Sequence, residues 1–147
     1  TFARHVRYAI LPTYVSCVSR WPYNHLYESG SEGLTIISHI ITEFVTTAAA
    51  RHEIPLILVF PKRETLKIIQ EYRKKPYKSL ISFLETNDFS FIDFGDVFVE
   101  KNHSRYYLND GHYSLDGNEV IANELINFIR CYDEKLETKV HPENEYL

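Results

Sequence analysis

The stretch of this chain that decides the fold is Ile54-Pro55-Leu56-Ile57-Leu58-Val59-Phe60. Every position in it is apolar, so both of its faces have to be buried. This pattern is typical of a central strand in a parallel sheet that helices cover on both sides. Proline is tolerated only at the first residues of such a strand, which fits Pro55, and Pro61 ends it. The stretch therefore predicts an α/β fold.

Around this strand, apolar residues recur at helical spacing in four segments. The predicted helices cover about residues 32–51, 64–73 and 78–86, and a last one begins after Ser114. Ser29 or Ser31 can cap the first helix, and Ser114 is an N-cap residue for the last. Pro76 separates the two short helices from each other. These segments supply the layers that a buried strand needs.

Other segments predict further strands and a short helical turn. Phe89 to Phe94 predicts a second buried strand, and Val97 to Glu100 has the length of one helical turn. Nearer the N-terminus, Arg7 to Leu11 predicts a short strand that Pro12 ends, and Tyr14 to Val18 predicts another. The order of helices and strands implies right-handed crossovers and a mainly parallel sheet with helices on both faces.

The chain is expected to form a single α/β domain over residues 1–132, followed by a charged tail over residues 133–147. The tail carries Pro142 and shows no apolar periodicity. In parallel sheets of this kind, sites lie at the carboxyl ends of the strands. Chemistry is therefore sought in the connections that follow the strands.

Composition excludes several classes of protein. The 147 residues are 44% hydrophobic and 24% charged, ordinary values for a soluble globular protein. A net charge of −4 argues against a nucleic-acid partner, and Arg73-Lys74-Lys75 is interpreted as a solvated helix end. No uninterrupted apolar run reaches the length of a membrane span. No cofactor is expected, and compartment and oligomeric state are left open.

Two further features concern the chain as a whole. Cys17 and Cys131 are widely separated and match no metal-ligand spacing. Methionine is absent and the sequence begins at Thr1 without a charged-then-apolar signal pattern. The missing methionine and the sequence at the N-terminus together lead us to expect that the chain is a processed or excised piece of a longer protein.

The leading candidates for chemistry are Asp110 and His112, in a loop just before the last predicted helix. A carboxylate this close can hold the imidazole in one tautomer and stabilise its cation, as a general base requires. The alternative is a simple Asn109-Asp110-Gly111 turn beside a surface histidine. A metal site that adds His103 to the pair is weaker, because no tight ligand spacing is present.

The block that starts Asp110-Gly111-His112-Tyr113 and continues to Ala122 resembles the last conserved block of the SGNH (GDSL-like) hydrolase superfamily. There, an Asp and a His precede a helix that opens with a polar residue and a glycine. The Asp-x-His spacing resembles the branch that includes the alginate O-acetylation proteins, with Tyr113 where that branch usually has Trp. The similarity spans about residues 32–132. It implies a flavodoxin-like three-layer α/β/α fold that is incomplete at its N-terminus.

The resemblance also implies roles for the two residues. Asp110 would orient the imidazole, and His112 would take a proton from a serine that attacks a small-molecule or carbohydrate ester. The family's Gly-Asp-Ser motif does not occur in the chain: Gly95-Asp96 is followed by valine, and Ser31 is interpreted as a helix cap. The serine is therefore expected upstream of Thr1, and the chain supplies the Asp-His half of the site.

Two other hypotheses remain. The fold can serve as a non-catalytic binding or interaction module in which Asp110 and His112 are a remnant turn. The chain can also be a stand-alone flavodoxin-like domain of unrelated function. The binding module would lack a reactive serine. In the domain of unrelated function, Asp110 and His112 would lie beyond hydrogen-bond distance of each other.

Overall fold

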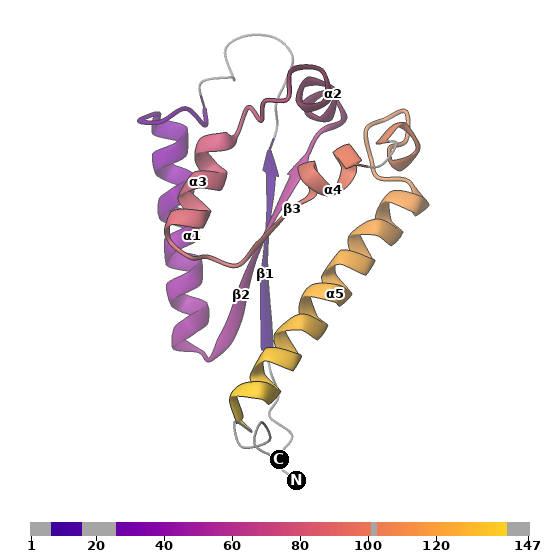
Figure 1. Ribbon diagram of the computed structural model, residues 1–147. Helices are drawn as coiled ribbons and strands as arrows, with labels where there is room; N and C mark the ends of the chain where they lie inside the picture. The colour runs from indigo at the N-terminus through magenta and orange to yellow at the C-terminus, as the bar shows by residue number, and fades with distance from the viewer. Residues whose placement is uncertain (1–6, 16–25, 101–102, 141–147) are drawn as a thin grey trace. The chain divides into compact units, whose positions relative to one another are not determined.

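In the computed structural model, the described residues are 7–15, 26–100 and 103–140. They belong to two compact units, Thr1–His103 and Ser104–Leu147. Figure 1 shows the elements of both. The single domain expected over residues 1–132 stays a prediction.

The first unit contains a parallel sheet of three strands in the order β1-β2-β3. These strands are β1 (Arg7–Val15), β2 (Glu53–Pro61) and β3 (Phe91–Asp93). In β2, Leu56 through Val59 are all buried, so successive side chains on both faces are covered. The predicted mixed α/β architecture with a parallel sheet built on this stretch is therefore confirmed. The three-layer, flavodoxin-like form of this architecture stays a prediction.

Strand β1 differs from the prediction. One continuous strand, Arg7–Val15, replaces the two extended segments expected on either side of Pro12. It pairs with β2 along its whole length, with Pro12 opposite Leu58. Among the described strands β1 lies at an edge of the sheet, where a residue without an N–H is tolerated if that side is unpaired. Residues 16–18 of the second expected strand lie outside the described residues.

The described part of the first unit also holds four helices: α1 (Glu32–Ala50), α2 (Arg63–Tyr72), α3 (Lys78–Thr86) and α4 (Phe94–Glu100). Helix α1 begins after Ser31, whose Oγ accepts the Leu34 N–H at 3.1 Å, so Ser31 rather than Ser29 is the cap. Helices α1 and α3 lie side by side, and α1 also contacts β2 (Figure 1). Helix α4 starts directly after the short strand β3 and contacts β2 and α2. The core is made by apolar side chains from these elements, with Phe94, Phe98, Leu66 and Leu80 fully buried.

Helix α1 is the one described helix long and apolar enough to cross a membrane. The same length and composition also fit a core helix or a signal sequence, so no membrane span is established. Polar residues such as Ser38 and Glu43 lie among the apolar residues of this helix, which buries Ile41 and Ala48. Ile36 and Ile40 are exposed on another side.

The second unit begins within the short 3-10 helix η2 (His103–Tyr106). It also contains an antiparallel bridge between Tyr107 and Tyr113 and the long helix α5 (Leu115–Val140). The helix continues through residues 133–140, which were predicted to belong to a charged tail. This segment holds good helix formers such as Leu136 and Glu137. Proline at 142 disfavours helical geometry at the residue before it, and the helix ends at Val140.

Candidate functional site

The loop that carries Asp110 and His112 is a tight hairpin. The Leu108 N–H donates to the His112 carbonyl at 2.7 Å, and the Gly111 N–H donates to the Leu108 carbonyl at 3.1 Å. Gly111 has a φ of 90°, a conformation that residues with a Cβ rarely adopt. The Tyr107 and Tyr113 rings, whose centroids are 4.8 Å apart, close the base of the hairpin. The predicted Asp-Gly turn is therefore present.

The hairpin is attached to the first turn of α5. Ser114 Oγ accepts the Gly117 N–H at 3.1 Å, as predicted for an N-cap, and donates to the Arg105 carbonyl at 2.7 Å. At Gly117 an added Cβ would collide with the Tyr106 carbonyl oxygen, so this close approach needs glycine. Arg105 also binds Asp116, with Nη2 and Oδ2 2.6 Å apart. These contacts fix the geometry of the loop relative to the helix.

The structure brings the two predicted site residues together. His112 Nδ1 lies 3.2 Å from Asp110 Oδ1, and the same oxygen accepts the His112 backbone N–H at 3.1 Å. The backbone hydrogen bond, followed by the side-chain one, lowers the pKa of Asp110. Both side chains are largely exposed, His112 by 80% and Asp110 by 63%. The pair is thus preformed, but water surrounds it.

This arrangement can orient a general base. A carboxylate at Nδ1 favours the tautomer that carries its proton there and leaves Nε2 to accept one. An exposed pair gains little strength from its surroundings, because water screens the charges. For the pair to act in a site shielded from water, further groups would have to cover His112.

Two of the described serines cap helices. The hydroxyl groups of Ser31 and Ser114 are engaged in helix capping. Gly95 and Asp96, which match two positions of the family motif, lie in α4 and are followed by Val97. Within the residues that the structure describes, no three His, Cys, Asp or Glu side chains are placed to hold a metal ion. The His103 side chain, part of the weaker metal hypothesis, is not among those described.

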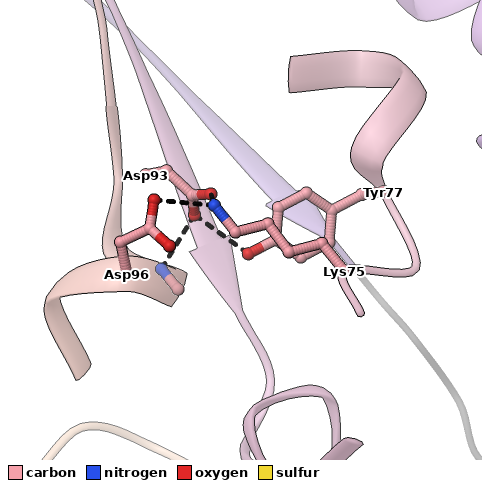
Figure 2. Close-up of polar contacts among 5 residues, drawn as sticks. Lys75, Tyr77, Asp93 and Asp96 are labelled. Carbon is pink, nitrogen blue, oxygen red and sulfur yellow. Dashed lines mark hydrogen bonds and ion pairs between the residues drawn. The ribbon is translucent and has the colours of Figure 1, made fainter. Parts of the chain in front are cut away.

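A second polar cluster, which the sequence did not single out, lies at the carboxyl end of β3 in the first unit (Figure 2). Lys75 Nζ lies 2.7 Å from Asp93 Oδ2 and 2.6 Å from Asp96 Oδ2. The other oxygen of Asp93 accepts the Tyr77 hydroxyl at 2.9 Å and the Gly95 N–H at 2.8 Å. The Asp93 side chain is only 3% exposed, and all its close partners are donors.

This cluster corrects the interpretation of the basic segment. Arg73 and Lys74 are exposed as predicted, but the Lys75 side chain is only 22% exposed. Burial opposes its charge, but hydrogen bonds to Asp93 and Asp96 outweigh that effect and raise the pKa of Lys75. The available sequence signal was a pair of acids, Asp93 at the end of β3 and Asp96 three residues later. Their partner lies 18 residues before Asp93, too far for a local pattern to identify.

Comparisons of the chain with protein-family models, with curated proteins and with solved structures found no match. The SGNH resemblance therefore stands on the residues of the last block alone.

Proposed function

We propose that this chain supplies the Asp-His half of an SGNH-like serine esterase or carbohydrate O-acyltransferase site. Asp110 orients His112, which takes the proton of a serine hydroxyl as that oxygen attacks an ester carbonyl. The protonated imidazole then returns the proton to the leaving alcohol, and an acyl-enzyme forms. Water or a sugar hydroxyl accepts the acyl group in the second half-reaction.

The observation that carries the proposal is the 3.2 Å contact between His112 Nδ1 and Asp110 Oδ1. This contact joins Asp110, which the resemblance makes the orienting acid, to His112, which it makes the base. The pair sits in a hairpin held by backbone hydrogen bonds and followed at once by α5, which matches the order of the family's last block. A preformed contact of this kind lowers the entropy cost of reaching a reactive geometry.

The proposal extends to the fold. We infer a flavodoxin-like three-layer α/β/α arrangement, in which the three described strands correspond to the sequential side of the sheet. In the 2-1-3-4-5 order of such sheets, strands 3, 4 and 5 are neighbours in chain order. The order β1-β2-β3 supports this assignment.

The direct test is ester hydrolysis by the full-length gene product that contains this chain. His112→Ala is expected to lower kcat by about a hundredfold or more, since general-base catalysis contributes on that scale. Asp110→Asn is also expected to lower kcat, because an amide no longer favours the tautomer of His112 that carries its proton on Nδ1. His39→Ala, which changes an exposed histidine of α1, is the matched control and should leave kcat unchanged.

Unchanged ester hydrolysis and acyl transfer in His112→Ala would exclude the proposed role. Equal losses in His112→Ala and His39→Ala would also exclude it, because the effect would then not depend on the Asp-His pair. Circular dichroism of each variant separates loss of activity from loss of structure.

A second candidate is a non-catalytic binding or interaction module. The specific observation that favours it is the hydrogen bond from the His112 N–H to Asp110 Oδ1, which gives the carboxylate a structural role in the turn. The high exposure of both side chains agrees with that role. This candidate predicts no hydrolysis by the full-length protein and no effect of His112→Ala on any binding measured.

A further inference from the structure

A pocket of about 540 Å³ lies in the first unit, apart from the Asp-His loop in the chain. Its walls come from the segment before α1, the end of α2, the α2–α3 connection and the start of α3. Its size falls within the range of about 300–1,000 Å³ that small-molecule sites occupy. Its lining includes neither Asp110 nor His112, so a ligand bound here is independent of the proposed hydrolase function.

Three lysines, Lys74, Lys75 and Lys78, line the pocket together with one carboxylate, Glu28. The charge of Lys75 is offset by Asp93 and Asp96, so Lys74 and Lys78 carry the positive charge of the lining. Lysine ammonium groups bind phosphate and carboxylate oxygens as point charges. Helix α3 also begins here without a side-chain cap on its first turn, and this end of a helix dipole favours the same sign of ligand.

The remaining lining is apolar or aromatic. Tyr27 and Tyr72 contribute rings, and Ile68 and Pro76 contribute aliphatic surface. Tyr72 is exposed, so its ring is accessible to a ligand. A flat ring or short apolar body can stack against such side chains while its charged group meets the lysines.

Lys75 connects the pocket to the buried cluster. Its ammonium is shared between buried Asp93 and Asp96, whose side chain is 63% exposed. An anion in the pocket can replace Asp96 as a partner of Lys75 while the contact to Asp93 is kept. Asp96 is therefore a competitor of the ligand for one ammonium group.

We propose that this pocket binds a small organic anion. Lys74, Lys75 and Lys78 hold its oxyanion group, and the tyrosines hold its ring or apolar body. The first probe is phenyl phosphate, which carries both parts. Benzoate replaces the phosphate by a carboxylate, and inorganic phosphate lacks the ring. Phenyl phosphate should bind most tightly, and the order of the other two distinguishes charge from ring contact as the main contribution.

The test is titration of the 147-residue chain by calorimetry, with amide chemical shifts recorded in parallel. Lys74→Ala/Lys78→Ala should weaken phenyl phosphate binding by about tenfold or more, since charge-assisted hydrogen bonds are lost. Lys62→Ala/Lys67→Ala removes two exposed lysines of the α2 region that do not line the pocket. This change should leave Kd within about twofold, because salt screens exposed charges that do not contact the ligand. Asp96→Asn should tighten binding, because it removes the competing carboxylate.

Three results would overturn the proposal. One is no saturable binding of phenyl phosphate to the unaltered chain. Another is equal weakening by both lysine pairs, which would show attraction by net charge alone. The third is a set of amide shifts confined to residues away from Ser29 and Ser79, which line the pocket from two different segments. The shift map uses the unaltered chain, so it decides the question even if a variant unfolds.

Discussion

At the scale of single residues, two carboxylates have opposite environments. Asp110 is exposed and contacts His112, two residues away, whereas Asp93 is buried and held by donors from three other residues. Their expected contributions differ accordingly. Asp110 defines the geometry of a loop, and Asp93 contributes to the stability of the first unit.

The titration of Asp110 tests its contact with His112. Since the folded pKa is lowered, the carboxyl carbon signal should titrate below the usual aspartate value of about 3.9. The associated stability is present above that unfolded value and is lost as the pH falls through the folded pKa. His112→Ala should raise the midpoint only part of the way, because the backbone hydrogen bond is the larger cause. A midpoint at or above the usual value would contradict the described geometry.

The Lys75 ion pair is tested by stability. Lys75→Met leaves the buried Asp93 without its cation and should reduce the free energy of unfolding by about 3 kcal/mol. Lys74→Met, at the exposed neighbour, should change it by less than about 0.5 kcal/mol. Urea denaturation measures both variants, and equal effects would contradict the burial of the pair.

The same pair predicts a pH dependence at the alkaline end. Because the folded pKa of Lys75 is raised, its stabilisation is fully present below the unfolded value of about 10.4. It is lost as the pH rises through the folded pKa. The difference in stability between the unaltered chain and Lys75→Met should therefore shrink at strongly alkaline pH. A difference that grows with pH would show the opposite sign of shift.

At the scale of elements, the hairpin and the start of α5 behave as one structure. Ser114 bonds both to the segment before the hairpin and to the first helical turn. Gly117 lets that turn approach the Tyr106 carbonyl. The position of the Asp-His pair therefore depends on a residue five positions after His112.

Gly117→Ala tests this dependence. The added methyl group collides with the Tyr106 carbonyl oxygen, so the free energy of unfolding of the second unit should fall by about 1–3 kcal/mol. Asn118→Ala, at an exposed position of the same turn, is the control. Amide exchange of the hairpin measures the local effect. Unchanged protection in Gly117→Ala would show that the loop does not rely on this contact.

At the scale of the whole molecule, local patterns predicted more than contacts between distant residues. Strand β2 was predicted from its uninterrupted apolar run, and helices α1, α2 and α3 from helical periodicity, because burial on one or both faces leaves a direct pattern in the sequence. The continuous strand through Pro12 was missed, since tolerance of a proline depends on which neighbour a strand has. The extension of α5 was missed because charged helix formers carry no apolar periodicity.

The candidate site divides in the same way. The contact between Asp110 and His112 was predictable because the residues are two positions apart. The Lys75 cluster joins the α2–α3 connection to the end of β3, so only the folded chain reveals it. The nucleophile, which the resemblance places in another block, cannot be identified from the last block.

If His112 activates a serine, a fluorophosphonate should label that serine in the full-length gene product, and mass spectrometry identifies the modified residue. We expect one labelled serine in the unaltered protein, labelling slowed by about a hundredfold in His112→Ala, and normal labelling in His39→Ala. A protein that takes up no label, or a serine that is labelled equally fast without His112, would contradict this role of His112.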